Sequence, residues 1–195
     1  MPRSEDSQAS WLAKPLCRRY VTSVFEATAV RCRDGDTVGR QEIEWAFGWL
    51  PDGECEPLGA WLRSAPESDH EAAVVVDLRS RGVERLWVVV GAGRTGLAAA
   101  MGGRTTGASV DGIVAGPTGE TGHLGSPFPA VVTGQIRDRL QRAVRRHGVF
   151  ESSAKALDFI AVALQRAERR LDEERSVAAQ QRRLAANAPM ASLSA

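Results

Sequence analysis

A glycine-rich segment, Gly91-Ala92-Gly93-Arg94-Thr95-Gly96, matches the spacing G-x-G-x-x-G and directly follows a short apolar run. In dinucleotide-binding proteins, glycines at this spacing let a pyrophosphate approach the N-terminus of a helix. Asp111 lies 20 residues beyond Gly91, about where an acid that binds the ribose is found. Gly91, Gly93 and Gly96 are therefore candidate cofactor-binding residues.

Three features weigh against a dinucleotide site. The segment follows a predicted antiparallel meander, whereas the fingerprint opens a βαβ unit. The region after Met101 offers only the short stretch Ala108 to Val114 as a second parallel strand. The chain is also too short for a complete doubly wound sheet in addition to the meander. Nucleotide binding by this loop therefore stands as an alternative.

A second group of residues that could do chemistry is a run of arginines on a predicted helix. Such a cluster can contact phosphates without reading bases. An exposed helix face balanced by the acids from Glu151 onward explains it equally well, and few aromatic residues lie nearby for stacking on single strands. The candidate DNA-binding residues are Arg137, Arg139, Arg142, Arg145 and Arg146.

Composition excludes several classes of protein. The 195 residues are 43% hydrophobic, and their formal net charge is only +1, so any basic surface must be local. The cysteines and histidines show no spacing typical of a disulfide scaffold or metal site. We find no signal peptide and no apolar run long enough for a membrane helix, and we expect a cytoplasmic protein, associated with the nucleoid if it binds DNA. The cysteines are Cys17, Cys32 and Cys55, and the histidines are His70, His123 and His147.

The first half of the chain predicts an antiparallel meander. Residues 1–17 show no period, and we expect a disordered leader. Residues 19–33 are rich in β-branched side chains and lead through Asp34-Gly35-Asp36, a hairpin signal, into a strand over residues 37–50. That second strand has four apolar residues at period two, which places them on one face: Ile43, Trp45, Phe47 and Trp49.

A third strand is predicted over residues 55–64, with Leu58, Ala60 and Leu62 on one side. Pro57 places this strand at a sheet edge or delays its start.

Helices and one buried strand are predicted next. Ser68 or Asp69 can cap a helix that runs to Arg79, and Gly82 suits its C-terminal cap. The apolar run over residues 85–90 is typical of a buried parallel strand, and residues 97–101 begin another helix.

The composition changes over residues 102–129, where eight glycines and three prolines occur among 28 residues. We predict a flexible loop there. A basic helix over residues 133–146 follows, and Gly148 breaks it. Ser152 or Ser153 then caps a helix to about Arg175 or beyond, before a disordered tail over 187–195. Its apolar stripe comprises Leu157, Ile160, Ala161, Leu164 and Leu171.

Three antiparallel strands, a helix, a buried strand and a helix follow one another in the order of an RNase H-like core. We therefore predict an α/β fold, with an RNase H-like mixed sheet over residues 18–101 and C-terminal helices over 130–186.

Four passages, taken in order, resemble the mutator-type transposases of insertion sequences. Residues 18–38 resemble the segment with the first catalytic Asp, and residues 45–63 resemble the strands that follow. Residues 77–97 resemble the helix, the Arg-Gly-Val turn and the strand that delivers the second Asp. Residues 136–170 resemble the C-terminal end, where a Gly-Val-Phe turn follows the helix that holds the catalytic Glu.

The chain departs from this family in two regions. The family's N-terminal DNA-binding helices would precede residue 18, where only a short leader stands. The Gly-rich stretch 102–129 replaces a long helical insertion. The resemblance therefore implies a truncated, internally deleted copy.

The resemblance implies two divalent metals, Mg²⁺ or Mn²⁺, held by three carboxylates. The first acidic position matches Glu26, a longer carboxylate that could ligate a metal. The second matches Ala92, which cannot. The third, counted back from Gly148, matches Gly134, and Asp138 is the nearest substitute. Asp138 could instead pair with Arg142 along the helix.

The implied family function is transposition of an insertion element by metal-dependent cleavage and strand transfer of DNA. We expect this copy to be catalytically impaired and to need no metal of its own. The implied partners are the DNA ends of the element and, as an option, further copies of this chain; no membrane is implied. An alternative is a non-catalytic derivative that binds DNA or a protein partner.

Overall fold

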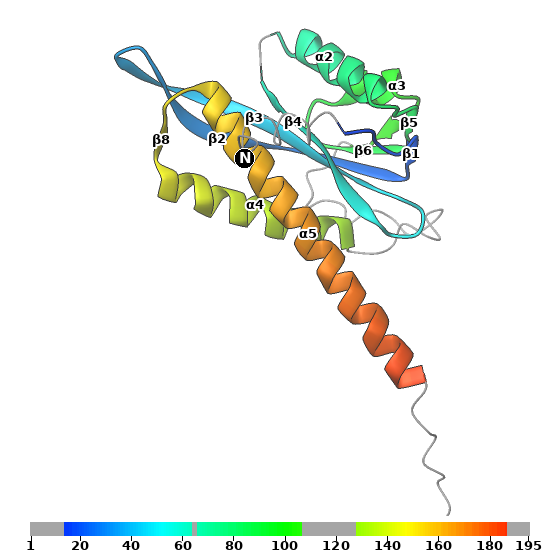
Figure 1. Ribbon diagram of the computed structural model, residues 1–195. Helices are drawn as coiled ribbons and strands as arrows, with labels where there is room; N and C mark the ends of the chain where they lie inside the picture. The colour runs from blue at the N-terminus through cyan, green and yellow to red at the C-terminus, as the bar shows by residue number, and fades with distance from the viewer. Residues whose placement is uncertain (1–13, 64–65, 107–127, 187–195) are drawn as a thin grey trace, which may run out of the picture.

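A computed structural model describes residues 14–63, 66–106 and 128–186. Figure 1 shows a central sheet with helices α2 (Glu67–Ser80) and α3 (Thr95–Ala100) on one face. Helices α4 (Phe128–His147) and α5 (Ser153–Ala186) lie on the other face, and α5 projects well beyond the sheet. The predicted α/β class, with a mixed sheet followed by C-terminal helices, is confirmed.

The predicted hairpin forms the centre of the sheet. Strands β2 (Thr22–Asp34) and β3 (Thr37–Trp49) pair antiparallel over their full length. The turn needs a residue with positive φ, and Gly35 supplies it at 57°.

Shorter strands complete the sheet, whose order is β4-β3-β2-β6-β7. Strand β4 (Cys55–Leu62) is antiparallel to β3 and lies at an edge, as Pro57 predicted. Strand β6 (Val88–Val90) is parallel to β2, and β7 (Arg104–Thr105) is parallel to β6. The predicted buried parallel strand is therefore present, although Trp87 interrupts it.

Two further pairs of short strands tie the segments together. Strand β8 (Val149–Phe150) pairs in parallel with β2, on the edge that β3 does not use. Strands β1 (Arg19–Tyr20) and β5 (Arg85–Leu86) form a separate parallel pair.

The prediction that Leu58, Ala60 and Leu62 share one side of β4 is wrong. Phe47 pairs with Pro57, but Ala46 pairs with Gly59, so Leu58 is an extra residue on β4. Such a bulge reverses the alternation of side chains. Leu58 therefore packs beneath α2 and Ala60 packs on the opposite face.

Two apolar clusters cover the two faces of the sheet. The four period-two residues of β3 pack together with α4 and α5, as predicted for one buried face: Ile43, Trp45, Phe47 and Trp49. In the predicted stripe of α5, Ile160, Ala161 and Leu164 are buried, and Leu157 and Leu171 are partly buried. The second cluster lies between the sheet and helices α2 and α3.

The ends of the helices correct some of the predicted caps. Pro66, rather than Ser68 or Asp69, precedes α2, and no side chain caps it. Gly82 follows the helix with φ of 99°, and its N–H donates to the carbonyl of Arg79 at 3.0 Å, as a C-terminal glycine should. At α5, Ser152 Oγ accepts a hydrogen bond from the N–H of Lys155 at 3.2 Å.

Two predicted irregular segments are partly ordered. Leu16, expected in the disordered leader, is buried, and Lys14 Nζ lies 2.6 Å from Glu168 and 3.2 Å from Glu56. In the predicted loop 102–129, Arg104–Thr105 forms β7 and helix α4 already begins at Phe128, not Thr133. Pro129 is tolerated there because the first turn of a helix needs no donor from it.

Asp111, His123, the first 13 residues and the tail 187–195 lie outside the described residues. Among the helices that are described, none has the length and apolarity needed to cross a membrane. The three cysteines are free thiols.

Candidate functional site

Glu26 lies in the middle of β2 and faces α4. It pairs across the sheet with Trp45, whose side chain packs on the same face as α4 and α5. Its side chain is only 16% exposed, and Arg137 Nη1 of α4 lies 3.4 Å from Glu26 Oε1. The carboxylate at the first acidic position is thus engaged by a guanidinium.

Ala92 lies in the turn after β6. Strand β6 runs parallel to β2, with Val90 level with Val24, and it ends two residues before Ala92. The backbone approach is close: a Cβ added at Gly91 would stand 3.0 Å from the carbonyl oxygen of Phe25. Ala92 is exposed and offers only a methyl group there.

Gly134 lies on α4, one turn before Arg137, at the edge of the buried face of the helix. A Cβ added there would meet nothing within 4 Å. Asp138 follows Arg137 directly, so it is turned about 100° around the helix, and it is exposed. No ion pair joins Asp138 to Arg142 within the described residues. The role of Asp138 as a substitute ligand stays a prediction, and this direction weighs against it.

The three positions that the resemblance assigns hold one carboxylate between them. Hard divalent cations take several oxygen ligands in a fixed geometry. Nowhere in residues 14–63, 66–106 and 128–186 do three His, Cys, Asp or Glu side chains gather as a metal site would require. Glu26 with a guanidinium beside it, an alanine and a glycine do not fit a site for two metals.

A cluster of buried ionisable side chains lies on the opposite face of the sheet. Glu44 of β3, His70 of α2 and Arg94 of the β6–α3 turn each expose 4% or less of their side chains. His70 Nε2 lies 2.7 Å from Glu44 Oε2, and Arg94 forms an ion pair with Glu44 Oε1. Burial raises the pKa of Glu44 above its ordinary value, although Arg94 and His70 oppose that shift.

The same cluster occupies the glycine-rich turn. Arg94 Nη1 also lies 3.4 Å from Glu67 and 3.7 Å from Glu71. Glu71 Oε2 accepts a hydrogen bond from the N–H of Leu97 at 3.2 Å, and a Cβ added at Gly96 would stand 2.5 Å from that oxygen. The protein's own carboxylates thus take the place where a pyrophosphate would approach the glycines.

This arrangement weighs against Gly91, Gly93 and Gly96 as a dinucleotide site. Because glycine has no side chain, Gly93 leaves room for Glu67 of α2, and Gly96 leaves room for Glu71. Helix α3 has only six residues, too few for an effective dipole at its N-terminus.

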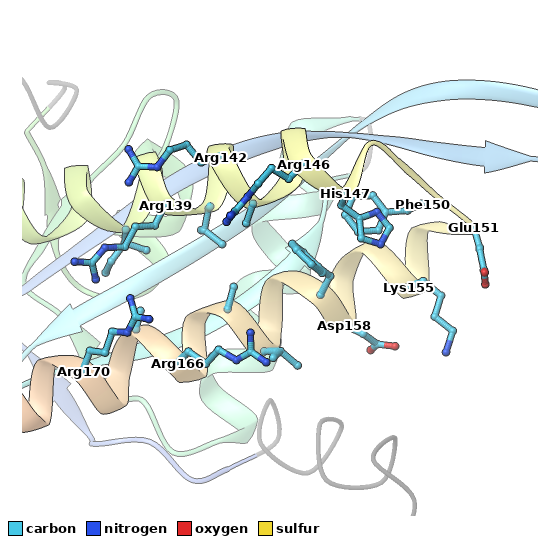
Figure 2. Close-up of a pocket in the computed structure, with 17 residues that line it drawn as sticks. Arg139, Arg142, Arg146, His147, Phe150, Glu151, Lys155, Asp158, Arg166 and Arg170 are labelled. Carbon is cyan, nitrogen blue, oxygen red and sulfur yellow. The ribbon is translucent and has the colours of Figure 1, made fainter.

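The arginines of α4 point to different neighbours. Arg137 reaches Glu26, and Arg145 lies outside the groove between α4 and α5. Arg139, Arg142 and Arg146 line that groove, and Arg166 and Arg170 of α5 join them from the other wall (Figure 2).

Sequence reasoning missed two groups of residues. Glu44 alternates with the apolar residues of β3, a pattern that normally indicates a solvent-facing side chain, and only the placement of α2 reveals its burial. Arg166 and Arg170 lie on the polar side of an amphipathic helix, and nothing in their spacing shows that α4 lies opposite.

Comparison with known proteins gives two matches. Residues 3–112, more than half of the chain, match the family described as "Transposase, Mutator family". A Sinorhizobium fredii protein named as a probable transposase for insertion sequence element ISRM3-like is 28% identical over 85 residues. That alignment covers 44% of this chain and 21% of the relative, so the chain matches about a fifth of the relative's length.

Proposed function

We propose that this chain, which belongs to the Mutator family of transposases, has an RNase H-like fold and binds DNA without cleaving it. One observation carries the proposal. Where the resemblance requires three carboxylates, Glu26 is the single acid among the three positions, and Arg137 lies 3.4 Å from it.

The RNase H-like assignment is supported by the topology. Three consecutive antiparallel strands are followed by two strands parallel to the first, in the order β4-β3-β2-β6-β7. Helix α2 joins the meander to the parallel strands, and α4 packs over the first strand. Along the chain, the three antiparallel strands, α2, β6 and α3 follow in the succession that the sequence pattern led us to expect.

In the family, divalent metals activate the attacking oxygen and stabilise the leaving oxygen, provided that carboxylates hold them in place. An added methylene at Glu26 displaces its oxygens, and about 1 Å of displacement can cost roughly a hundredfold in rate. Ala92 and Gly134 supply no ligand. We therefore derive no cleavage step for this chain.

The residues that would hold DNA differ from the carboxylates that would hold metal. The arginines of α4 are exposed in the described structure, apart from Arg137, which is engaged by Glu26. Guanidiniums suit phosphate oxygens because they donate two parallel hydrogen bonds. A derivative that had lost its metal ligands would keep this capacity.

A cleavage assay tests the proposal. The purified chain is incubated with supercoiled plasmid and with DNA carrying inverted repeats, in Mg²⁺ or Mn²⁺, beside the Glu26→Gln variant. We expect no nicking above that of the variant, together with retarded migration of DNA that weakens as salt rises. Metal-dependent nicking that disappears in Glu26→Gln would overturn the proposal.

A further inference from the structure

Helices α4 and α5 line an open groove of about 860 Å³ on the face of the sheet away from α2 and α3. This volume lies at the upper end of the range for small-molecule sites, roughly 300–1,000 Å³. Apolar side chains such as Leu140, Ala143 and Ala163 lie between the two walls. The groove therefore has room for more than one phosphate group.

Arginines line both walls of this groove. Figure 2 shows Arg139, Arg142 and Arg146 on α4 and Arg166 and Arg170 on α5. All five are exposed, and within the described part of the chain none forms an ion pair or hydrogen bond. The acids Glu151 and Asp158 lie near Lys155, toward the end of the groove where α5 begins. The arginine part of the groove thus carries an excess of positive charge.

A group of three aromatic rings lies at the same end of the groove, and His147 is its exposed member. The ring of His147 stacks on Phe150, with centroids 3.9 Å apart and planes 7° from parallel. Phe159 of α5 meets both rings edge-on, with centroids 5.2 Å away. His147 is exposed, so its ring is available to a base. The structure thus brings together aromatic rings that are separated along the sequence.

The dimensions favour one nucleic-acid strand. The axes of packed helices lie about 8–10 Å apart and side chains fill much of that distance, whereas a duplex is wide enough for its major groove to admit a whole helix. A duplex would touch only the rims, while one strand could contact both walls. A basic groove with a stacking ring is the usual arrangement for single strands.

We propose that the groove between α4 and α5 binds single-stranded DNA. The five arginines contact successive phosphates, and His147 stacks on a base at one end. This inference rests on the proposed DNA-binding function, and it specifies which surface of the protein binds and which form of DNA is bound.

The test compares two double variants with equal loss of charge. Arg142→Gln/Arg166→Gln removes one arginine from each wall. Arg33→Gln/Arg169→Gln removes two exposed arginines, one of β2 and one of α5, that do not line the groove. Binding of a fluorescein-labelled thymine oligodeoxynucleotide is measured by anisotropy between about 50 and 200 mM salt, with a duplex of equal length in parallel.

We expect the wild-type chain to bind the single strand more tightly than the duplex. In the groove variant, the slope of log affinity against log salt should fall by about 1.4, roughly 0.7 for each lost phosphate contact, and affinity near 0.1 M salt should drop about 20-fold. The control variant should stay within about twofold. His147→Ala should reduce the preference for the single strand, because it removes the ring that stacks on a base.

Equal losses in the two double variants, an unchanged groove variant, or tighter binding of the duplex would each overturn this inference. The first two results leave general DNA binding, and so the proposed function, intact. Absence of all binding at low salt would overturn both, whereas metal-dependent cleavage with a functioning groove would overturn the proposed function alone.

Discussion

Arg94 connects the glycine-rich turn to the rest of the molecule. Its side chain is 4% exposed and faces carboxylates from two elements, Glu44 of β3 and Glu67 and Glu71 of α2. A buried charge depends on its partners because water no longer solvates it. Arg94 therefore fixes the turn that carries Ala92, and the G-x-G-x-x-G spacing has a structural explanation.

Replacing Arg94 should destabilise the fold strongly. Arg94→Gln leaves Glu44 and Glu71 buried without their cation, which we expect to lower the free energy of unfolding by about 3–5 kcal/mol. Arg33→Gln, an exposed arginine of β2 without a contact in the described structure, should change it by less than about 0.5 kcal/mol. Urea denaturation of both variants measures the difference, and equal stabilities would refute the role assigned to Arg94.

Individual side chains were predictable only where the strand pattern determined their face. Glu26 was identified by position, but its partner Arg137 lies 111 residues away, and no local pattern links them. Glu44 looked like a solvent-facing residue because its neighbours Ile43 and Trp45 define the buried face. Its burial depends on α2, which packs over the second face of the sheet.

Elements that span several periods of their pattern were the easiest to predict. The β2–β3 hairpin and helices α2, α4 and α5 were recognised because each shows several periods of its pattern. Strands β7 and β8 have two residues each, too few for any period. The bulge at Leu58 reversed the faces of β4, since a bulge arises from pairing with β3 and not from the local sequence.

Replacing two helical glycines by alanine should have opposite effects on the stability of the fold. At Gly134 of α4 an added Cβ meets nothing within 4 Å, so Gly134→Ala should stabilise the fold by about 0.5–1 kcal/mol through lower entropy of the unfolded chain. At Gly96 of α3 the Cβ would stand 2.5 Å from Glu71 Oε2, so Gly96→Ala should destabilise it. Thermal unfolding by circular dichroism compares the variants, and a stabilised Gly96→Ala would contradict the packing of Glu71 against α3.

At the scale of the whole molecule, charge is nearly balanced, with 25 basic against 24 acidic side chains. The fold separates these charges. The carboxylates of Glu44, Glu67 and Glu71 gather around Arg94 on one face of the sheet. On the other face, arginines without an ion pair among the described residues gather in the α4–α5 groove. The overall composition could not indicate this separation of charges, because the separation depends on which helix covers which face of the sheet.

With Glu26 as the one carboxylate at the three acidic positions, we expect this chain to bind no divalent metal there. Isothermal titration calorimetry with Mn²⁺ measures this for the wild-type chain, Glu26→Gln and the restored variant Ala92→Asp/Gly134→Glu. The wild-type chain and Glu26→Gln should give the same titration, and the restored variant should gain saturable binding because it returns the two missing carboxylates. Saturable Mn²⁺ binding by the wild-type chain that is lost in Glu26→Gln would show that the site still holds metal.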